Sequence, residues 1–306
     1  MIFFYIFHNL LSILIIDKRF FTQLLFELFA WPSIIYIYIK KPDTFDIQSY
    51  VDAISYAHVF EPGYAYFVGF IRDLGFSNRF TVGAFQTFVA LIFFFLTSTL
   101  LRWKFLSVGL LLCSMSVAFS LAVNNNLRQG AATILIFLGS YFMLERKLSL
   151  GIFLFCVAPL FHFSSVVFSP LLAGAIFVFN YTRVVSRLER GRLSFVYIMI
   201  AVLALSFALG VKISVDYVYE NYQGLAFEGR VGLLEKTLAI GAVFIISEYF
   251  MGRFNRASRA LVFFRLCRFF LLTTCFFIGV LGNLDEAGSR IVFIYFVCEL
   301  VVSILS

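Results

Sequence analysis

Short polar segments interrupt an otherwise apolar sequence, and they carry the residue types that could do chemistry. The first such segment interleaves carboxylates with aromatic residues: Asp43, Asp46, Tyr50, Tyr56, His58, Glu61 and Tyr64. Aromatic faces stack on the C–H faces of sugar rings, and carboxylates accept hydrogen bonds from sugar hydroxyls. The segment therefore indicates a sugar-binding surface. An aromatic belt at a membrane interface is the alternative.

The second segment places an arginine at the start of a predicted helix. Asn124, Asn125 and Asn126 precede Arg128 and Gln129, and an apolar run then continues to residue 144. An asparagine can cap such a helix, but the helix dipole disfavours a cation in the first turn. A bound pyrophosphate would offset that cost, and so would a salt bridge to a carboxylate. The sequence leaves both interpretations open.

Three further segments hold polar groups. His162 lies in Phe161–Ser165, inside a long apolar stretch, where it is either packed and hydrogen-bonded or chemically active. The segment 285–290 opens the last apolar run. The segment 216–230 combines tyrosines with charged residues: Asp216, Tyr217, Tyr219, Glu220, Tyr222 and Arg230. With three histidines, and with five cysteines that lack metal-ligand spacing, we expect no metal site.

The composition predicts the kind of structure that holds these segments. Hydrophobic residues make up 62% of the 306 residues and charged residues 13%, against about 45–50% and about 25% in soluble domains. This excludes a soluble globule and a disordered chain. Continuous apolar runs exclude an outer-membrane barrel. The net charge of +7 comes from short clusters between those runs, which favours a polytopic membrane protein over a nucleic-acid-binding one.

We predict an all-α integral membrane bundle of about 10–11 transmembrane segments, forming a single domain over 1–306. The stretch 148–180 has basic clusters at both ends, so it must turn back near His162 instead of crossing once. We also expect 64–74 to be an amphipathic segment in the interface. The predicted spans are 2–16, 20–39, 79–101, 105–123, 127–144, 148–162, 163–180, 193–212, 233–251, 262–282 and 290–306.

The basic clusters also predict the orientation. The positive-inside rule places 17–19, 102–104, 145–147, 181–192 and 252–268 in the cytoplasm, where their arginines and lysines contact anionic lipid. The polar segments then share the opposite side, in loops near 40–78, 124–129, 213–232 and 283–290. Ionisable groups gathered on one face of a membrane mark function more often than structure.

The order of these motifs resembles that of the EpsG/Wzy-type family of bacterial polysaccharide polymerases. The family pattern is an early Asp with a following Tyr, then Glu-Pro-Gly-Tyr, Asn-x-x-Arg-Gln, Phe-His-x-Ser and a late Ser-Arg that leads a Tyr-Phe helix. The matching residues are Asp46 with Tyr50, Glu61–Tyr64, Asn125–Gln129, Phe161–Ser164, and Ser289-Arg290 with Tyr295-Phe296. Relatives carry a further C-terminal segment, which we expect this chain to lack.

The resemblance implies a polymerase of the bacterial inner membrane that works on the periplasmic face. It would join lipid-linked oligosaccharide repeats into O-antigen or a related surface glycan. A hydroxyl of one repeat would attack the anomeric carbon of a chain carried on undecaprenyl pyrophosphate, which leaves. The resemblance implies no nucleotide sugar, metal or other cofactor, and it implies a chain-length regulator as a partner.

That reaction assigns roles to the motif residues. The leaving pyrophosphate needs fixed positive charge, which makes its expected ligands Arg128, Arg290 and Arg230, with Asn125 and Gln129 beside them. The acceptor hydroxyl needs a base, and the candidates are His162, Glu61 and Asp46. The sugar rings would be held by tyrosines: Tyr50, Tyr64, Tyr217 and Tyr222.

Two other classes of protein remain as alternatives. A lipid-linked glycan flippase would need polar residues at mid-membrane in several spans. The predicted spans are nearly free of charge, with Glu27 as the clearest exception. A membrane acyltransferase that modifies the same glycan would need an acyl-donor site facing the cytoplasm, where the sequence shows only arginines that set topology.

Overall fold

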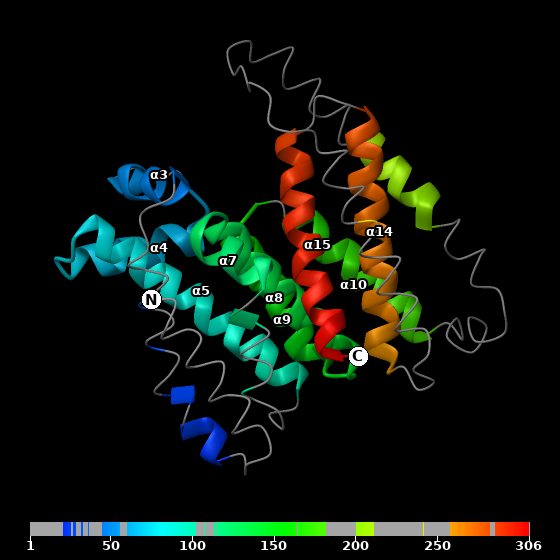
Figure 1. Cartoon of the computed structure of the whole chain (residues 1–306), viewed down its shortest axis with the longest axis horizontal. Helices are drawn as coiled ribbons and strands as arrows, with labels where there is room; N and C mark the ends of the chain where they lie inside the picture. Colours follow the sequence, from blue (N-terminus) through cyan, green and yellow to red (C-terminus); the bar gives the residue numbers. More distant parts are fainter. Residues whose placement is uncertain are drawn as a thin grey trace. The chain divides into compact units, whose positions relative to one another are not determined.

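The computed structural model describes residues 45–55, 60–101, 116–163, 165–181, 200–210, 258–281 and 285–305, together with short pieces elsewhere (Figure 1). All regular secondary structure in these residues is helical, as the composition predicts. Three helices are long and apolar enough to cross a membrane: Asn78–Leu100, Leu127–Leu144 and Arg259–Val280. Shorter apolar helices cover Leu148–Leu160, Phe168–Phe177 and Ile200–Gly210. The chain is therefore an all-α protein suited to a membrane, and the total number of spans stays a prediction.

The chain divides into two compact units after Phe177. The first unit holds α3 (Phe45–Ala53), α4 (Pro62–Asp73), α5 (Asn78–Leu100), α7 (Val117–Asn124), α8 (Leu127–Leu144), α9 (Leu148–Val157) and the short 3₁₀ helix η2 (Ala158–Leu160). The helix α10 (Ser165–Tyr181) runs across the division. The second unit holds α14 (Arg259–Leu281) and α15 (Asp285–Leu305).

The helix α8 is the core of the first unit. It packs against α5, α7 and α9, and 94% of its length is buried (Figure 1). Small residues allow this packing: a Cβ atom on Gly139 would lie 3.0 Å from the carbonyl oxygen of Gly151 in α9, so the two backbones touch. Arg146 turns the chain between these helices with a left-handed φ of 63°. The predicted helix 127–144 is confirmed.

Serine N-caps set the start of two neighbouring helices. The hydroxyl oxygen of Ser77 accepts from the Phe80 amide at 3.3 Å at the start of α5, and Ser116 accepts from Phe119 at 3.1 Å at the start of α7. Ser116 is extended, so it interrupts the predicted span 105–123. Asn126 occupies the N-cap position of α8, but its side chain makes no capping hydrogen bond, contrary to one of our interpretations.

The stretch 148–181 is broken at the predicted place. The helix α9 ends at Val157, η2 follows to Leu160, and α10 begins at Ser165. Pro159 explains the end of α9, because a proline in a helix lacks the amide donor and clashes with the carbonyl four residues earlier. The amides of Phe161 and His162 both bond the carbonyl of Ala158, at 3.0 and 3.3 Å. The prediction that 148–180 is not one continuous helix is confirmed.

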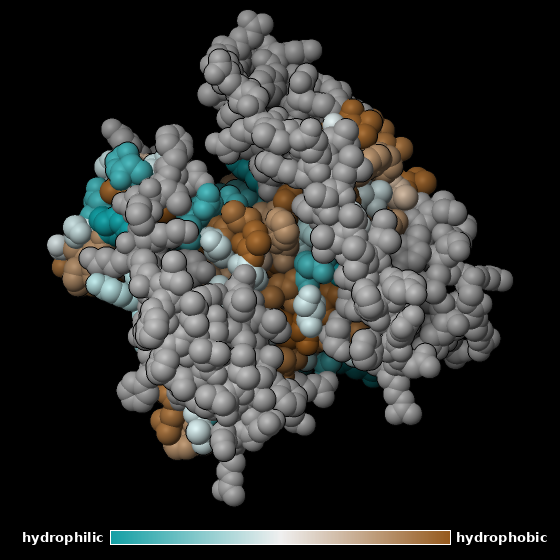
Figure 2. Space-filling view, in the orientation of Figure 1, coloured by the Kyte–Doolittle hydropathy of each residue, from teal (hydrophilic) through white to brown (hydrophobic). Residues whose placement is uncertain are grey.

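The surface of the first unit is divided between polar and apolar helices. Gln48, Ser49 and Asp52 of α3 are exposed, and Figure 2 shows a hydrophilic surface over this helix. The next helix, α4, buries Tyr64 and Val68 and exposes aromatic residues, with Tyr66 81% and Phe70 65% exposed. The predicted segment 64–74 is therefore a helix with a large exposed apolar face, and its place in the membrane interface stays a prediction.

The second unit contains a partly buried ion pair that the sequence does not predict. Arg268 of α14 is 0% exposed, and its Nη1 lies 2.9 Å from both carboxylate oxygens of Glu299 in α15. Tyr295 donates its hydroxyl to Glu299 Oε2 at 3.0 Å. The sequence predicts spans that are nearly free of charge, and it assigns Arg268 to the basic cluster 252–268. In the structure α14 begins at Arg259, and both Arg268 and Glu299 lie inside helices. The cytoplasmic placement of 252–268 stays a prediction.

Candidate functional site

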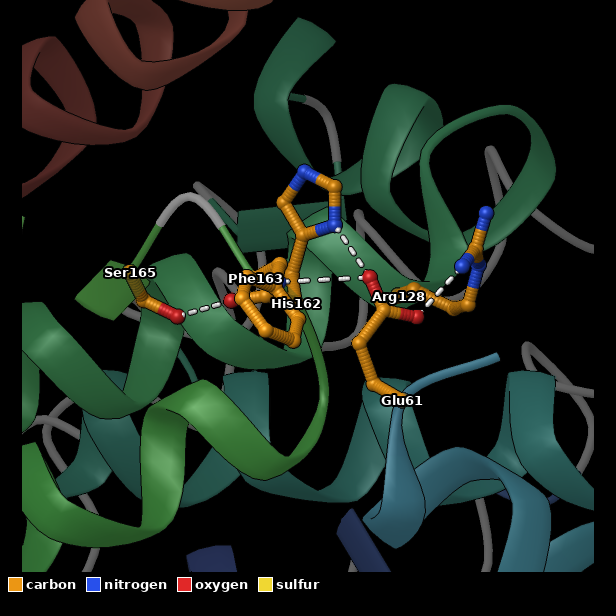
Figure 3. A network of polar contacts seen from close by, with 5 residues as sticks. All are labelled: Glu61, Arg128, His162, Phe163 and Ser165. Carbon is orange, nitrogen blue, oxygen red and sulfur yellow. Dashed lines mark hydrogen bonds and ion pairs between the residues drawn. The ribbon is translucent and has the colours of Figure 1, made fainter. Parts of the chain in front are cut away.

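Three motifs that are distant in the sequence meet at one end of the first unit. Glu61 comes just before α4, Arg128 lies in the first turn of α8, and His162 follows η2. Figure 3 shows the Glu61 carboxylate between the imidazole and the guanidinium. Residues of the predicted loops near 40–78 and 124–129 and of the turn at His162 therefore lie together at one end of the first unit. The structure brings these three charged or titratable candidates together.

Glu61 accepts three hydrogen bonds from polar groups around it. Its Oε1 lies 3.0 Å from His162 Nδ1 and accepts from the Phe163 amide at 3.2 Å, while Oε2 accepts from Arg128 Nη1. Burial alone would raise the pKa of Glu61, but the hydrogen bond from His162 and the charge of Arg128 lower that pKa to about 2. The carboxylate is therefore ionised at neutral pH.

The local sequence explains how Glu61 comes to this position. Pro62 occupies the first turn of α4, where its missing amide donor costs nothing. The Glu61 carbonyl accepts from the Ala65 amide at 2.9 Å and so closes that turn. The carboxylate is thereby free to reach across to α8. There it forms a salt bridge with Arg128, and this salt bridge offsets the unfavourable placement of a cation at a helix N-terminus.

Aromatic rings enclose the guanidinium of Arg128. Its central carbon lies 4.3 Å from the centroid of the Phe60 ring and 5.8 Å from those of Tyr50 and Tyr64. These distances are within the range of cation–π attraction. Sequence reasoning missed Phe60, although an aromatic residue directly before Glu61 could have suggested it. The cage restricts how the guanidinium can move.

Tyr64 lies inside this cage instead of on its surface. It is 1% exposed, and its ring packs edge-on against Phe85 at 4.9 Å and against Phe60 at 5.7 Å. Burial, followed by the nearby Tyr50, raises the pKa of Tyr64, so its hydroxyl stays protonated. No ring face of Tyr64 is left for a sugar, so we correct its expected stacking role to one of packing beside Arg128. Tyr50 is partly exposed and better placed for a sugar.

His162 presents one nitrogen without a hydrogen bond. Its side chain is 13% exposed, and its Nδ1 faces the Glu61 carboxylate. Because an ionised carboxylate can only accept, Nδ1 must carry a proton, and Nε2 of the neutral ring then has a lone pair. That Nε2 atom is buried and makes no hydrogen bond with any residue that the structure describes. Ser165 holds the backbone here, since its amide and its hydroxyl both donate to the His162 carbonyl.

The other predicted site residues lie in several places. Asn125 is the C-cap of α7, and Gln129 is buried in α8 with 7% exposure. Asp46 lies in the first turn of α3, but its side chain is outside the described part of the chain. Arg290 is exposed on α15 in the second unit, so its proximity to Arg128 stays a prediction. The remaining candidates are outside the described residues: Tyr217, Tyr222 and Arg230.

The arrangement can move a proton and hold negative charge. A histidine whose Nδ1 donates to a carboxylate is held in one tautomer and one orientation, so Nε2 is the nitrogen that can accept a proton as a general base. The adjacent Arg128 supplies a fixed cation. Base and cation are linked through the same carboxylate, which ties their positions to each other.

Comparison with known proteins identifies the family. The model of the EpsG family matches residues 35–306. No curated protein and no solved structure matches the chain. The matched region includes every motif described above, from Asp46 to Phe296, and it covers most of the sequence. The chain therefore belongs to the EpsG family.

Proposed function

We propose that this protein is a glycosyltransferase that joins undecaprenyl-pyrophosphate-linked oligosaccharide repeats into O-antigen or a related surface polysaccharide. It would act at the periplasmic face of the bacterial inner membrane. Membership of the EpsG family supports a polymerase-like role in polysaccharide synthesis. The observation that carries the proposal is the unbonded Nε2 of His162, held beside the Glu61–Arg128 pair.

In this proposal His162 acts as the base. Its Nε2 takes the proton of an acceptor sugar hydroxyl while the hydroxyl oxygen forms a bond to the anomeric carbon of the donor. The bond from that carbon to the pyrophosphate oxygen breaks, and the pyrophosphate keeps the electron pair. Glu61 stabilises the resulting imidazolium through the Nδ1–H bond. Glu61 itself, with a pKa of about 2, is too weak a base for this step at neutral pH.

Arg128 has donors to spare for the leaving group. A guanidinium carries five N–H donors, and Nη1 is directed at Glu61. The Nε atom has no hydrogen-bond partner among the described residues. That Nε atom is buried, and Tyr50 also shares a hydrogen bond with the guanidinium. The N–H groups left over on the two terminal nitrogens could hold a phosphate oxygen without breaking the ion pair. We propose Arg290 and Arg230 as further cations for the same pyrophosphate, and Tyr50, with Tyr217 and Tyr222, as contacts to the sugar.

An assay with purified protein tests this function. The protein in lipid nanodiscs is given a single lipid-linked repeat, and the products are separated by length. The wild-type protein should give a ladder of longer chains and release undecaprenyl pyrophosphate, and His162→Asn should give neither. Asp52→Asn is the matched control, because Asp52 is exposed on α3 and accepts from Gln48 at 2.8 Å, away from the candidate base.

The outcome that overturns the proposal is equally specific. Wild-type protein that moves the intact repeat across the bilayer without lengthening it would be a carrier. Protein that adds an acyl group to the repeat would be an acyltransferase. A ladder of unchanged yield from well-folded His162→Asn would leave polymerisation in place and remove His162 from the mechanism.

A further inference from the structure

The start of α4 touches the backbone of η2 at a glycine. A Cβ atom placed on Gly63 would lie 2.8 Å from the carbonyl oxygen of Leu160, 3.0 Å from its Cβ and 3.1 Å from its carbonyl carbon. Real Cβ atoms essentially never come within 3.0 Å of a heavy atom from another part of the chain. The nearest atom belongs to the backbone, so it cannot rotate away as the end of a side chain could. Any larger residue at 63 must push α4 and η2 apart.

This contact lies next to both members of the proposed dyad. Gly63 follows Glu61 by two positions, and Leu160 precedes His162 by two positions. The Glu61 carboxylate reaches His162 Nδ1 at 3.0 Å and the Phe163 amide at 3.2 Å. Hydrogen bonds weaken steeply when distance and angle depart from these values. A displacement of η2 from α4 therefore acts directly on the bonds between the carboxylate and the histidine.

Nothing in α4 itself requires a glycine at this position. Glycine is a poorer helix former than alanine. Among the described glycines, the left-handed φ that only glycine adopts easily occurs at Gly75 and not at Gly63. Gly69 lies in the same helix, and a Cβ atom there would have nothing within 4 Å. The requirement at 63 is thus for close approach, and Gly69 offers a matched comparison.

We infer that Gly63 is a positioning residue, which lets α4 approach η2 closely enough for Glu61 to orient His162. The inference rests on the proposed function where it concerns activity. Its geometric part concerns only the Glu61–His162 hydrogen bond. In this role Gly63 makes no contact with the substrate. It acts through the position of the Glu61 carboxylate.

The test compares Gly63→Ala with Gly69→Ala by NMR and by activity. Protein labelled with ¹⁵N-histidine should show a low-field proton on His162 Nδ1, assigned by its absence in His162→Asn. Glu61→Gln, which removes the charged acceptor, gives the reference spectrum for a lost bond. We expect Gly63→Ala to match Glu61→Gln and Gly69→Ala to match the wild type. The polymerisation rate should fall by about 100-fold in Gly63→Ala, as expected for a misplacement of about 1 Å, and should stay unchanged in Gly69→Ala.

A second variant separates backbone contact from side-chain packing. The Leu160 side chain is 43% exposed, and Leu160→Ala keeps the carbonyl that Gly63 approaches. We expect Leu160→Ala to retain the Nδ1 proton signal and the activity. Loss of the signal in Leu160→Ala would overturn the inference. So would a Gly63→Ala protein that retains the signal, or one that fails to fold, since the contact would then serve the fold alone.

The two proposals fail in different ways. If the wild-type protein does not polymerise but the Gly63→Ala variant still loses the Nδ1 proton signal, the proposed function is wrong and the positioning role is supported. If the wild-type protein polymerises and the Gly63→Ala spectrum is unchanged, the positioning role is wrong and the proposed function is unaffected.

Discussion

Each unit of the protein holds a partly buried arginine–glutamate pair, and the two pairs differ in what surrounds them. In the first unit Glu61 pairs with Arg128 at the ends of helices, and the same carboxylate bonds a histidine whose Nε2 has no partner among the described residues. In the second unit Arg268 pairs with Glu299 inside helices, and the third member is Tyr295, which donates its hydroxyl to the carboxylate.

The difference shows why a buried ion pair alone does not identify a reactive site. Such pairs serve stability weakly, because desolvation offsets much of the attraction. In the second unit, Tyr295 and Glu299 are one helical turn apart, and the tyrosine proton is already used. In the first unit a basic nitrogen, Nε2 of His162, is buried without a hydrogen-bond partner among the described residues. An unused acceptor beside a fixed cation, and not the ion pair itself, marks the candidate site.

The largest expected effect comes from removing that acceptor. His162→Asn should lower the polymerisation rate by about 10²–10⁴-fold, the usual contribution of a general base. The thermal unfolding midpoint should change little, because asparagine can still donate to Glu61. Rates on a lipid-linked repeat, beside unfolding curves in detergent, measure both effects. Equal losses of rate and stability would instead make His162 a structural residue.

Breaking the second pair should affect stability and not chemistry. Arg268→Met leaves the Glu299 carboxylate without its cation inside the unit; a fully buried pair would lose about 3–5 kcal/mol, and the 23% exposure of Glu299 makes a smaller loss expected. Membrane abundance and the unfolding midpoint should both fall. The double variant Arg268→Met/Glu299→Leu removes both charges and should recover most of the loss. A stable Arg268→Met protein with no activity would contradict this prediction, because it would show that the second pair serves function instead of stability.

The first pair should be sensitive to the shape of its cation. Arg128→Lys keeps the charge beside Glu61 but lacks the planar guanidinium that can bond the carboxylate and a phosphate together. We expect normal abundance and a rate about 10-fold lower, as for the loss of one charge-assisted hydrogen bond. Full activity in Arg128→Lys would show that only the charge matters, and would weaken the assignment of Arg128 to pyrophosphate.

The smallest expected effect is a pH dependence confined to the first pair. The pKa of Glu61 is lowered from 4.5 to about 2 by its partners in the folded protein, against the effect of burial. Its contribution to stability is therefore fully present above pH 4.5 and is lost as the pH falls toward 2. Unfolding midpoints measured across this range should drop less steeply in Glu61→Gln. Identical slopes in both proteins would contradict the ionised, paired state of Glu61.

The sequence predicted the members of the candidate site better than their contacts. The motifs identified Glu61, Arg128 and His162, because charged and titratable residues are rare between apolar runs. Sequence spacing could not show that Arg128 pairs with Glu61, 67 positions away, because that contact depends on how α4 and α8 pack. Hydropathy averaged over the last span also hid Glu299, since a single charge barely changes the mean of an apolar helix, and Arg268 was counted with a basic cluster instead of inside a helix.

The same limit applies to the fold. Long apolar runs predicted α5 and α8 closely, and the charge on both sides of 148–180 predicted its break. The interruption at Ser116 was missed, because a lone serine is compatible with a span until its backbone is seen to be extended. Local capping depends on dihedral angles that composition does not report.

The enclosed position of α8 has a mechanical consequence. With its neighbours packed around it and its backbone against α9 at Gly139, α8 cannot slide or tilt without opening the core of the first unit. Arg128, in its first turn, is thereby a stationary anchor. If the protein is the polymerase proposed above, the growing glycan, and not the core helix of the first unit, is then the part that moves between successive additions.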